Sequence, residues 1–452
     1  MNSVSTQAKR PNSTLVKRRS SMPDRVGVLV FLIPCVQFVK IVLVGSLTGS
    51  DLLLLGLFVY LAFRKEIKIK TPAGKWFVIL GLLWLASQCV TDIVRHSAFA
   101  DYARGWSNIG ITLIGFAVLY TLMYQQPRRL LLFGWGLVVG NVLLFFINPT
   151  PAMLGDESNA WKFAFAGSAT LGVFLIASSK RCRGPWPVIL SVIIGMINMV
   201  EGARSVGGVC LAVALYLVIT RLSRAKGEEV SRFKTKTIVV LAASILIGVS
   251  AVLWSYGYAA DAGVLGEEAR HKYEEQSSGK YGVILGGRPE LFATGPAIYD
   301  SPILGHGSWA REPLYIIEEH EALDLLGYEG SRFIDPEQIK EGLIPTHSYL
   351  FGAWVDSGIL GAVFWGWVFV LTARGLMRVY PATAVLLPLM SYTAFSLLWE
   401  ILFSPYGTQE RLTFPYTLVI MMTCMGVMPA KAVRAVATSA RRISRSRPKR
   451  IA

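Results

Sequence analysis

The chain has 452 residues, of which 53% are hydrophobic and 16% are charged, and its formal net charge is +16. A typical soluble domain has about 25% charged and about 45–50% apolar residues, so this composition argues against a soluble globular protein. A net positive charge suggests nucleic-acid binding in a soluble protein, but its meaning depends on where the charges lie along the chain.

The apolar residues form long blocks that contain few charges. Each block has about 17–22 residues, the length that a helix needs to cross a hydrocarbon core of about 30 Å. We therefore predict an all-α integral membrane protein with about 12 transmembrane helices. The predicted spans, in chain order, are Val26–Gly45, Leu52–Phe63, Trp76–Ile93, Trp106–Tyr124, Leu130–Ile147, Phe163–Ser178, Trp186–Val200, Ser205–Thr220, Thr237–Trp254, Tyr349–Leu371, Thr383–Phe403 and Leu412–Met428.

Every second connection between these spans is strongly basic. The basic connections and the two ends of the chain hold about 32 of the 45 Lys and Arg residues. Under the positive-inside rule this alternation places both termini and the basic connections in the cytoplasm. The charge is therefore mainly topological, with added attraction of the Arg441–Arg450 cluster to membrane lipids, and nucleic acid is not an expected partner.

This topology divides the chain into five parts. Residues 1–25 form a basic cytoplasmic tail, 26–255 carry transmembrane helices 1–9, 256–347 form a large outer loop domain, 348–428 carry helices 10–12, and 429–452 form a second basic tail. The outer loop mixes aromatic and aliphatic residues with turn-forming glycines, which is typical of a folded element. Helical stretches are expected there at Gly266–Gln276, Pro289–Tyr299 and Pro336–Gly342.

Several residues on the predicted outer side have side chains suited to chemistry. His347 directly precedes the tenth span, where an imidazole can act as a general base. The alternative is an interfacial histidine that only anchors the end of the helix. Arg288 follows two glycines at an expected helix start, a combination suited to phosphate oxygens, or it pairs with a loop carboxylate. Arg204, in a short outer turn, requires an anionic partner, and Glu201 is the nearest alternative to a substrate.

No pattern in the sequence announces a metal or a nucleotide cofactor. The five cysteines, Cys35, Cys89, Cys182, Cys210 and Cys424, lie in predicted spans or in a cytoplasmic connection, and the spacing of a zinc site or a Walker-type loop is missing. No internal repeat is visible, although many twelve-span carriers are built from two related halves. A secondary transporter or flippase of lipid-linked sugars nevertheless stays open as the alternative function.

Three stretches together resemble one family, the O-antigen ligase and polymerase family of bacterial envelope glycan enzymes. The first runs from Gly287-Arg288-Pro289-Glu290-Leu291 to Ala297–Gly307, with Pro302-Ile303-Leu304-Gly305-His306-Gly307 similar to the family's Pro-Leu-Leu-Gly-x-Gly. The second is His347-Ser348-Tyr349-Leu350 leading into Asp356-Ser357-Gly358-Ile359-Leu360-Gly361. The third, Ala203-Arg204-Ser205-Val206-Gly207, is similar to the segment that opens a late span. Ser348 and Asp356 stand where the family more often has Asn and Glu.

The resemblance implies a metal-independent, inverting glycosyltransferase of the GT-C type in the bacterial inner membrane. In this family a glycan leaves its undecaprenyl diphosphate carrier for an acceptor hydroxyl on the periplasmic face. The acceptor is the lipid A-core for a ligase and another lipid-linked glycan for a polymerase. His347 would then be the catalytic residue and Arg204, Arg288 and Arg311 the diphosphate-binding residues, with no cofactor.

Overall fold

Helices dominate the computed structural model, which describes residues 24–42, 44–155, 160–179, 181–225, 254, 257–263, 266–282, 286–328, 336–377 and 385–426. Within these residues the only sheet is a short antiparallel hairpin of β1 (Lys40–Val42) and β2 (Ser46–Thr48). The expected all-α class is therefore confirmed for the described part of the chain.

Five of the described helices are long and apolar enough to cross a membrane: α3 (Pro72–Arg95), α4 (Phe99–Met123), α5 (Pro127–Ile147), α9 (Arg204–Ala225) and α17 (Ile359–Leu376). Shorter apolar helices are α1 (Arg25–Cys35), α2 (Gly49–Phe63), α7 (Ala166–Ala177), α8 (Trp186–Val200) and α18 (Leu387–Phe403), and α19 spans Glu410–Met425. These helices give the chain the character of a multi-pass membrane protein. The ninth predicted span, 237–254, lies outside the described residues except for Trp254.

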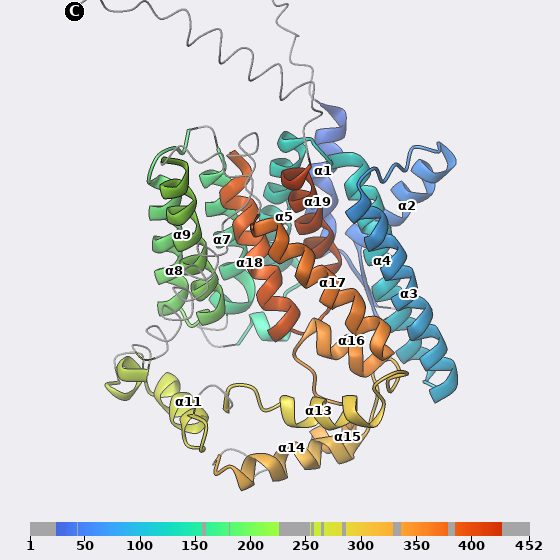
Figure 1. Cartoon of the computed structure of the whole chain (residues 1–452), viewed down its shortest axis with the longest axis vertical. Coiled ribbons are helices and arrows are strands. Elements are labelled where there is room, and N and C mark those ends of the chain that lie inside the picture. The colour runs from blue at the N-terminus through green and yellow to red at the C-terminus, as the bar shows by residue number, and fades with distance from the viewer. Residues whose placement is uncertain are drawn as a thin grey trace, which may run out of the picture.

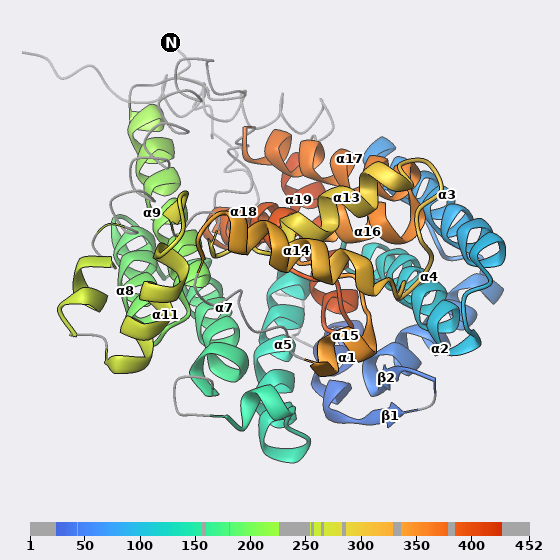
Figure 2. The ribbon, with the colours of Figure 1, turned by 90° about the horizontal axis from the view of Figure 1, so that it is seen from below.

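The apolar helices stand side by side in a bundle (Figure 1). α8 and α9 lie on one flank and α2, α3 and α4 on the other, with α17, α18 and α19 between them. A layer of shorter helices, α11 (Glu267–Ser277), α13 (Leu291–Asp300), α14 (Pro313–Leu325) and α15 (Pro336–Glu341), covers one end of this bundle. Figure 2 shows α13 and α14 running across that end, which we call the capped end.

The other end of the bundle gathers the basic connections, and we call it the basic end. Arg129 pairs with Asp24 at 2.9 Å, which brings the start of α5 beside the start of α1. The backbone N–H of Gln125 donates to Thr423 Oγ1 at 3.2 Å, which places the ends of α4 and α19 together. Basic residues in the described connections and first helical turns at this end include Arg64, Lys65, Lys68, Lys70, Lys75, Arg128, Arg181 and Arg183.

Two predicted spans differ from the helices that the structure contains. The helix expected over Val26–Gly45 ends at Cys35, and the chain continues through a 3-10 turn into the β1–β2 hairpin. The helix expected over Tyr349–Leu371 is broken into α16 (Tyr349–Ser357) and α17 by Gly358, which has φ +69°. Both interruptions lie toward the capped end. Backbone groups there form hydrogen bonds with other segments of the chain in place of the next helical turn.

Aromatic residues fill the centre of the bundle. Phe77 contacts Phe116 with ring centroids 4.3 Å apart and Phe364 at 5.5 Å, and Trp365 contacts Phe414 at 4.7 Å. These rings join α3, α4, α17 and α19 into a core whose large side chains fix the spacing of the helices. The capped end of the same four helices carries the candidate site.

The outer helices follow the sequence expectation only in part. α11, α13 and α15 lie within two residues of the predicted stretches at Gly266–Gln276, Pro289–Tyr299 and Pro336–Gly342, but α14 was not predicted. The residues that α14 buries are Tyr315, Ile316, Glu319 and Leu323, so a carboxylate stands at a position where helical periodicity requires an apolar residue.

Candidate functional site

A cavity of about 250 Å³ lies at the capped end of the bundle. Its walls come from α3, α4, α16 and α17 and from the connections at 309–310, 343–348 and 405–406. The lining combines the aromatic residues Trp84, Trp309, Tyr349, Trp365 and Tyr406 with the polar residues Gln88, Asn108, Thr346, Ser348 and Asp356. An apolar wall that carries a few convergent polar groups is typical of a small-molecule site.

Two of the motif stretches lock into each other beside this cavity. The backbone N–H of His306 donates to Val355 O at 2.7 Å, and that of Gly307 donates to Asp356 O at 3.0 Å. A Cβ atom added at Gly358 would lie 1.9 Å from the carbonyl oxygen of Ile303. The glycine is therefore required by a close backbone approach, and the break between α16 and α17 receives the 303–307 loop.

The end of α3 fastens the same loop from the other side. Asp92 accepts hydrogen bonds from the backbone N–H of Ser308 at 2.6 Å, from Ser308 Oγ at 2.8 Å and from Trp106 Nε1 at 2.8 Å. Arg95 donates to Gly305 O at 3.0 Å and to Ser301 Oγ at 2.7 Å. A buried carboxylate with this many donors has a structural role, because its hydrogen-bonding capacity is already used by the protein.

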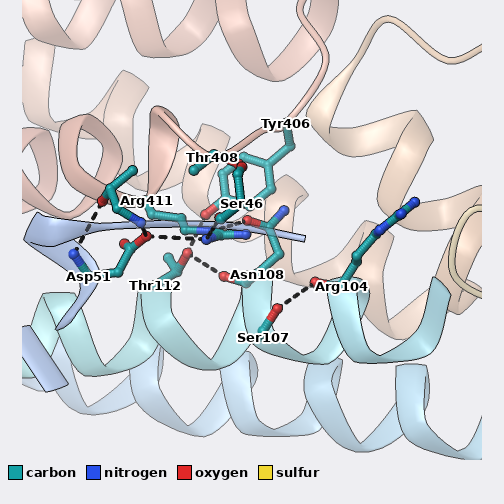
Figure 3. Close-up of polar contacts among 10 residues, drawn as sticks. Ser46, Asp51, Arg104, Ser107, Asn108, Thr112, Tyr406, Thr408 and Arg411 are labelled. Carbon is teal, nitrogen blue, oxygen red and sulfur yellow. Dashed lines mark hydrogen bonds and ion pairs between the residues drawn. The ribbon is translucent and has the colours of Figure 1, made fainter. Parts of the chain in front are cut away.

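Behind the cavity lies a buried arginine, Arg411, in the first turn of α19. Its Nε donates to Asn108 Oδ1 at 2.7 Å, and its Nη1 lies 3.3 Å from Asp51 Oδ2 and 3.2 Å from Ser46 O. Figure 3 shows Arg411 above α4, between Asp51 and Asn108, while the side chain of Arg104 points away from this group. The charge is thus paired within the protein, and its bond to Asn108 fixes the orientation of an amide that lines the cavity.

The sequence-predicted His347 lies at the rim of this site. Its side chain is exposed, between Thr346 and Ser348, which both line the cavity. Ser348 accepts from the backbone N–H of Phe351 at 3.1 Å, which caps α16, and donates to Ile401 O at 2.8 Å. The serine that stands where the family more often has Asn therefore ties the histidine segment to the last turns of α18.

Arg288 reaches the same turns of α18. Its Nη1 donates to Phe403 O at 3.0 Å, and its guanidinium lies 4.6 Å from the Phe403 ring centroid and 5.6 Å from that of Trp399. Glu290 lies 3.5 Å away, so the pairing with a loop carboxylate that was left open from the sequence is present. A cation at a helix C-terminus is also favoured by the helix dipole. Arg288 and, through Ser348, the segment that carries His347 are thus both bound to the last turn of α18.

Arg311 lies on the opposite side of the cavity, toward α4. It forms a bidentate pair with Asp101, with Nη2 3.3 Å from Oδ1, and this hydrogen bonding raises the pKa of the Arg311 guanidinium above its usual value. Arg104 lies 3.7 Å from the same carboxylate. Two guanidinium groups therefore share the Asp101 carboxylate near the cavity, and Glu341 adds a second negative charge close to Arg311.

Arg204 is the first residue of α9 and also belongs to the capped end. α9 and α18 run in opposite directions, and their side chains meet where the rings of Tyr216 and Phe395 lie 5.8 Å apart. The helical rise places Arg204 roughly 18 Å, and Phe403 roughly 12 Å, from this contact toward the same end. Arg204 thus stands on the α9 flank of the capped end.

The structure adds residues that the sequence did not single out for chemistry. Asp356 lines the cavity, and its carboxylate makes no hydrogen bond or ion pair with the described residues. Trp309, at the rim, is a bulky residue with φ +51°, an uncommon left-handed conformation. The sequence marks Asp356 as part of a motif and as a charge within an apolar span, whereas no periodicity or spacing points to Trp309. In the described part of the chain, no group of three or more His, Cys, Asp or Glu side chains is placed to hold a metal ion.

Comparison with known proteins adds no relative. No protein-family model matches the chain, and no curated protein matches it. The motifs and the geometry around the cavity are therefore the observations that bear on function.

Proposed function

We propose that this chain is a membrane glycosyltransferase that moves a glycan from undecaprenyl diphosphate to an acceptor hydroxyl, as an O-antigen ligase or a polymerase of O-antigen or exopolysaccharide. One observation carries the proposal. The two stretches that resemble the family, at 287–307 and 347–361, are far apart in sequence, yet they contact each other. The second stretch lines the cavity, and the first leads directly into the lining residues Trp309 and Ala310. Such convergence is expected if the motifs build a single site and is not required if the resemblance is accidental.

The proposed chemistry assigns each group a separate task. The acceptor oxygen attacks the anomeric carbon of the glycan, the bond from that carbon to the diphosphate oxygen breaks, and the hydroxyl proton passes to His347. The departing diphosphate gains negative charge, which Arg288 and Arg204 stabilise, with Arg311 as a third contributor. Glu290, 3.5 Å from Arg288, competes with the diphosphate and has to yield when the donor binds.

The proposed orientation follows from the charge of the two ends. The basic end faces the cytoplasm under the positive-inside rule, so both termini lie there and the capped end faces the periplasm of a bacterial inner membrane. Lipid-linked donors require a site at the membrane surface. The cavity, Arg288 and His347 all lie at the capped end, as such a site requires, and about twelve spans are needed to complete this topology.

The decisive experiment is a transfer assay with purified full-length protein in lipid nanodiscs. The donor is an undecaprenyl-diphosphate-linked glycan, and the acceptors are lipid A-core and a second lipid-linked glycan. We expect His347→Ala to lower the transfer rate about 10²- to 10⁴-fold, the usual contribution of general base catalysis, without loss of donor binding. His271→Ala is the matched control, because His271 is an exposed histidine on α11 that lies 3.4 Å from Glu275.

The assay also separates the alternatives. Full transfer by the His347→Ala variant removes this histidine from the mechanism. Donor binding without transfer by the wild type to either acceptor favours the carrier or flippase. Transfer to lipid A-core indicates a ligase, and transfer to the lipid-linked glycan indicates a polymerase.

A further inference from the structure

We infer that the cavity at the capped end binds one uncharged sugar ring. The ring packs against Trp309, and its hydroxyl groups form hydrogen bonds with Asp356, Gln88 and Asn108. This inference deepens the proposed glycan transfer, because it names the part of the substrate that occupies the cavity. The size of the cavity, its charge and the hydrogen-bonding groups that the protein leaves unused all favour this ligand.

The size of the cavity limits the ligand. Its volume of about 250 Å³ lies just below the range of about 300–1,000 Å³ that is common for small-molecule sites. At about 30 Å³ for each water molecule, it holds roughly eight waters. A ligand of one ring therefore fits, whereas a longer oligosaccharide has to extend out of the cavity.

The charge of the lining argues against a phosphate. Asp356 is the only acidic or basic side chain among the lining residues, and no lysine or arginine faces this cavity. An anion placed there would find no cationic side chain in the lining to pair with. The diphosphate of the proposed donor must therefore bind outside, toward the arginines, and the cavity is left to a neutral part of the substrate.

The unused hydrogen-bonding groups include both donors and acceptors. Gln88 Nε2 donates to Ser308 Oγ at 2.9 Å and to Asp356 O at 3.3 Å, so its carbonyl oxygen is left over as an acceptor. Asn108 Oδ1 accepts from Arg411 at 2.7 Å, so its amide N–H₂ is left over as a donor. Together with the Asp356 carboxylate they match hydroxyl groups, which donate and accept at once. An organic cation would have no use for the Asn108 donor.

The aromatic lining supplies the remaining requirement. Trp309 is 36% exposed and stands at the rim in a left-handed backbone conformation, which is uncommon for a bulky residue. The rings of Trp84, Tyr349, Trp365 and Tyr406 form further parts of the wall. Flat aromatic rings suit the apolar faces of a sugar.

Binding of simple methyl glycosides tests this inference without any transfer reaction. The probes are methyl β-glucoside, methyl β-galactoside, methyl α-rhamnoside and methyl N-acetyl-β-glucosaminide, added to the full chain in nanodiscs and followed by saturation-transfer NMR. We expect at least one of them to bind saturably. Asp356→Ala should weaken binding about 2- to 10-fold, the effect of losing a hydrogen-bonding side chain.

Trp309→Ala is the second variant, because a half-exposed side chain is replaced without risk to the buried core. It should weaken glycoside binding about 2- to 10-fold, whereas Trp309→Phe, which keeps a flat ring, should retain most of the affinity. Trp76→Ala is the matched control, since Trp76 is an exposed tryptophan at the other end of α3, 54% accessible. The control should bind glycosides as the wild type does.

Two results would overturn the inference: none of the four glycosides binds, or the Asp356 and Trp309 variants bind them as the wild type does. Binding of tetramethylammonium in place of glycosides would also overturn it and indicate an organic-cation site. Failure of the proposed function is recognised separately. Saturable glycoside binding without transfer from the lipid-linked donor would support the sugar site and contradict the proposed transferase function.

Discussion

Glu319 is buried in the helical layer at the capped end, and no described basic side chain forms an ion pair with it. It is 5% exposed on α14, and its Oε2 has no hydrogen-bond partner among the described residues. Burial, and secondly the negative charge of Glu290, raise the pKa of Glu319 to about 7. Because Glu290 also contacts Arg288, this residue connects the outer layer to the end of α18.

The raised pKa makes the stability of the outer layer depend on pH. Between about pH 4.5 and pH 7 the folded state holds a proton on Glu319 that the unfolded state has released, so stability is greatest below pH 4.5 and declines up to about pH 7. We expect Glu319→Gln to remove this decline and to raise the melting temperature at pH 8, but not at pH 4.5. Thermal unfolding followed by tryptophan fluorescence measures the effect. Glu321→Gln, at an exposed position of the same helix, is the control, and an equal rise in both variants would refute the assignment.

At the scale of single residues, the sequence indicated some of the site and could not indicate the rest. Local context and motif resemblance pointed to Arg288 and His347, and the structure binds Arg288 and the neighbour of His347, Ser348, to the end of α18. The unused donors and acceptors of Gln88 and Asn108 could not be predicted, because they depend on which atoms distant residues already occupy. Tertiary contacts decide which polar side chains stay available to a ligand.

Among the elements, the junction of α16 and α17 restricts the residue type most strictly, because it requires glycine at position 358. Gly358 combines φ +69° with a backbone approach that leaves no space for a side chain. Any L-residue at this position therefore meets two separate penalties, a strained backbone conformation and a clash with Ile303 O. The packing of the 303–307 loop against this junction depends on both being absent.

Replacing Gly358 by alanine should therefore separate the two motif stretches. We expect Gly358→Ala to destabilise the protein by about 2–4 kcal/mol and to lower its melting temperature in a thermal-shift assay. Gly366→Ala is the matched control in α17, where an added Cβ has no heavy atom within 4 Å. Helix propensity favours alanine there by up to about 1 kcal/mol, so the control should melt at or above the wild-type temperature. Equal melting of the two variants would contradict the interlock.

The apolar blocks predicted the existence of the bundle helices, because a continuous apolar stretch has few alternatives to a helix in a membrane. They did not predict how two of these blocks are interrupted. Ser50 Oγ donates to Ile33 O at 2.7 Å where the first helix ends, and Ile359 N donates to Ile303 O at 3.2 Å where α17 begins. Hydropathy cannot register such interruptions, since the replacement partners come from distant segments.

The whole molecule is polarised between its two ends. The basic connections collect at one end, and the helical layer with the cavity covers the other. We predict that a membrane-impermeant maleimide added to intact cells labels Leu325→Cys, a position on α14 that is 87% exposed. Arg128→Cys, exposed at the basic end, should be labelled only after the membrane is permeabilised. The parent chain, with its five natural cysteines, gives the background, and the reverse pattern would invert the proposed orientation.

The ion pair of Asp51 and Arg411 has a consequence for how the protein is made. The two residues are 360 positions apart, and both are buried, with side-chain exposures of 1% and 7%. At about 5–20 residues per second, the ribosome needs roughly 20–70 s to supply the arginine after the aspartate has emerged. During that interval Asp51 has only the hydrogen bond from the backbone N–H of Thr48, at 2.9 Å, and the buried ion pair forms after α19 has been inserted.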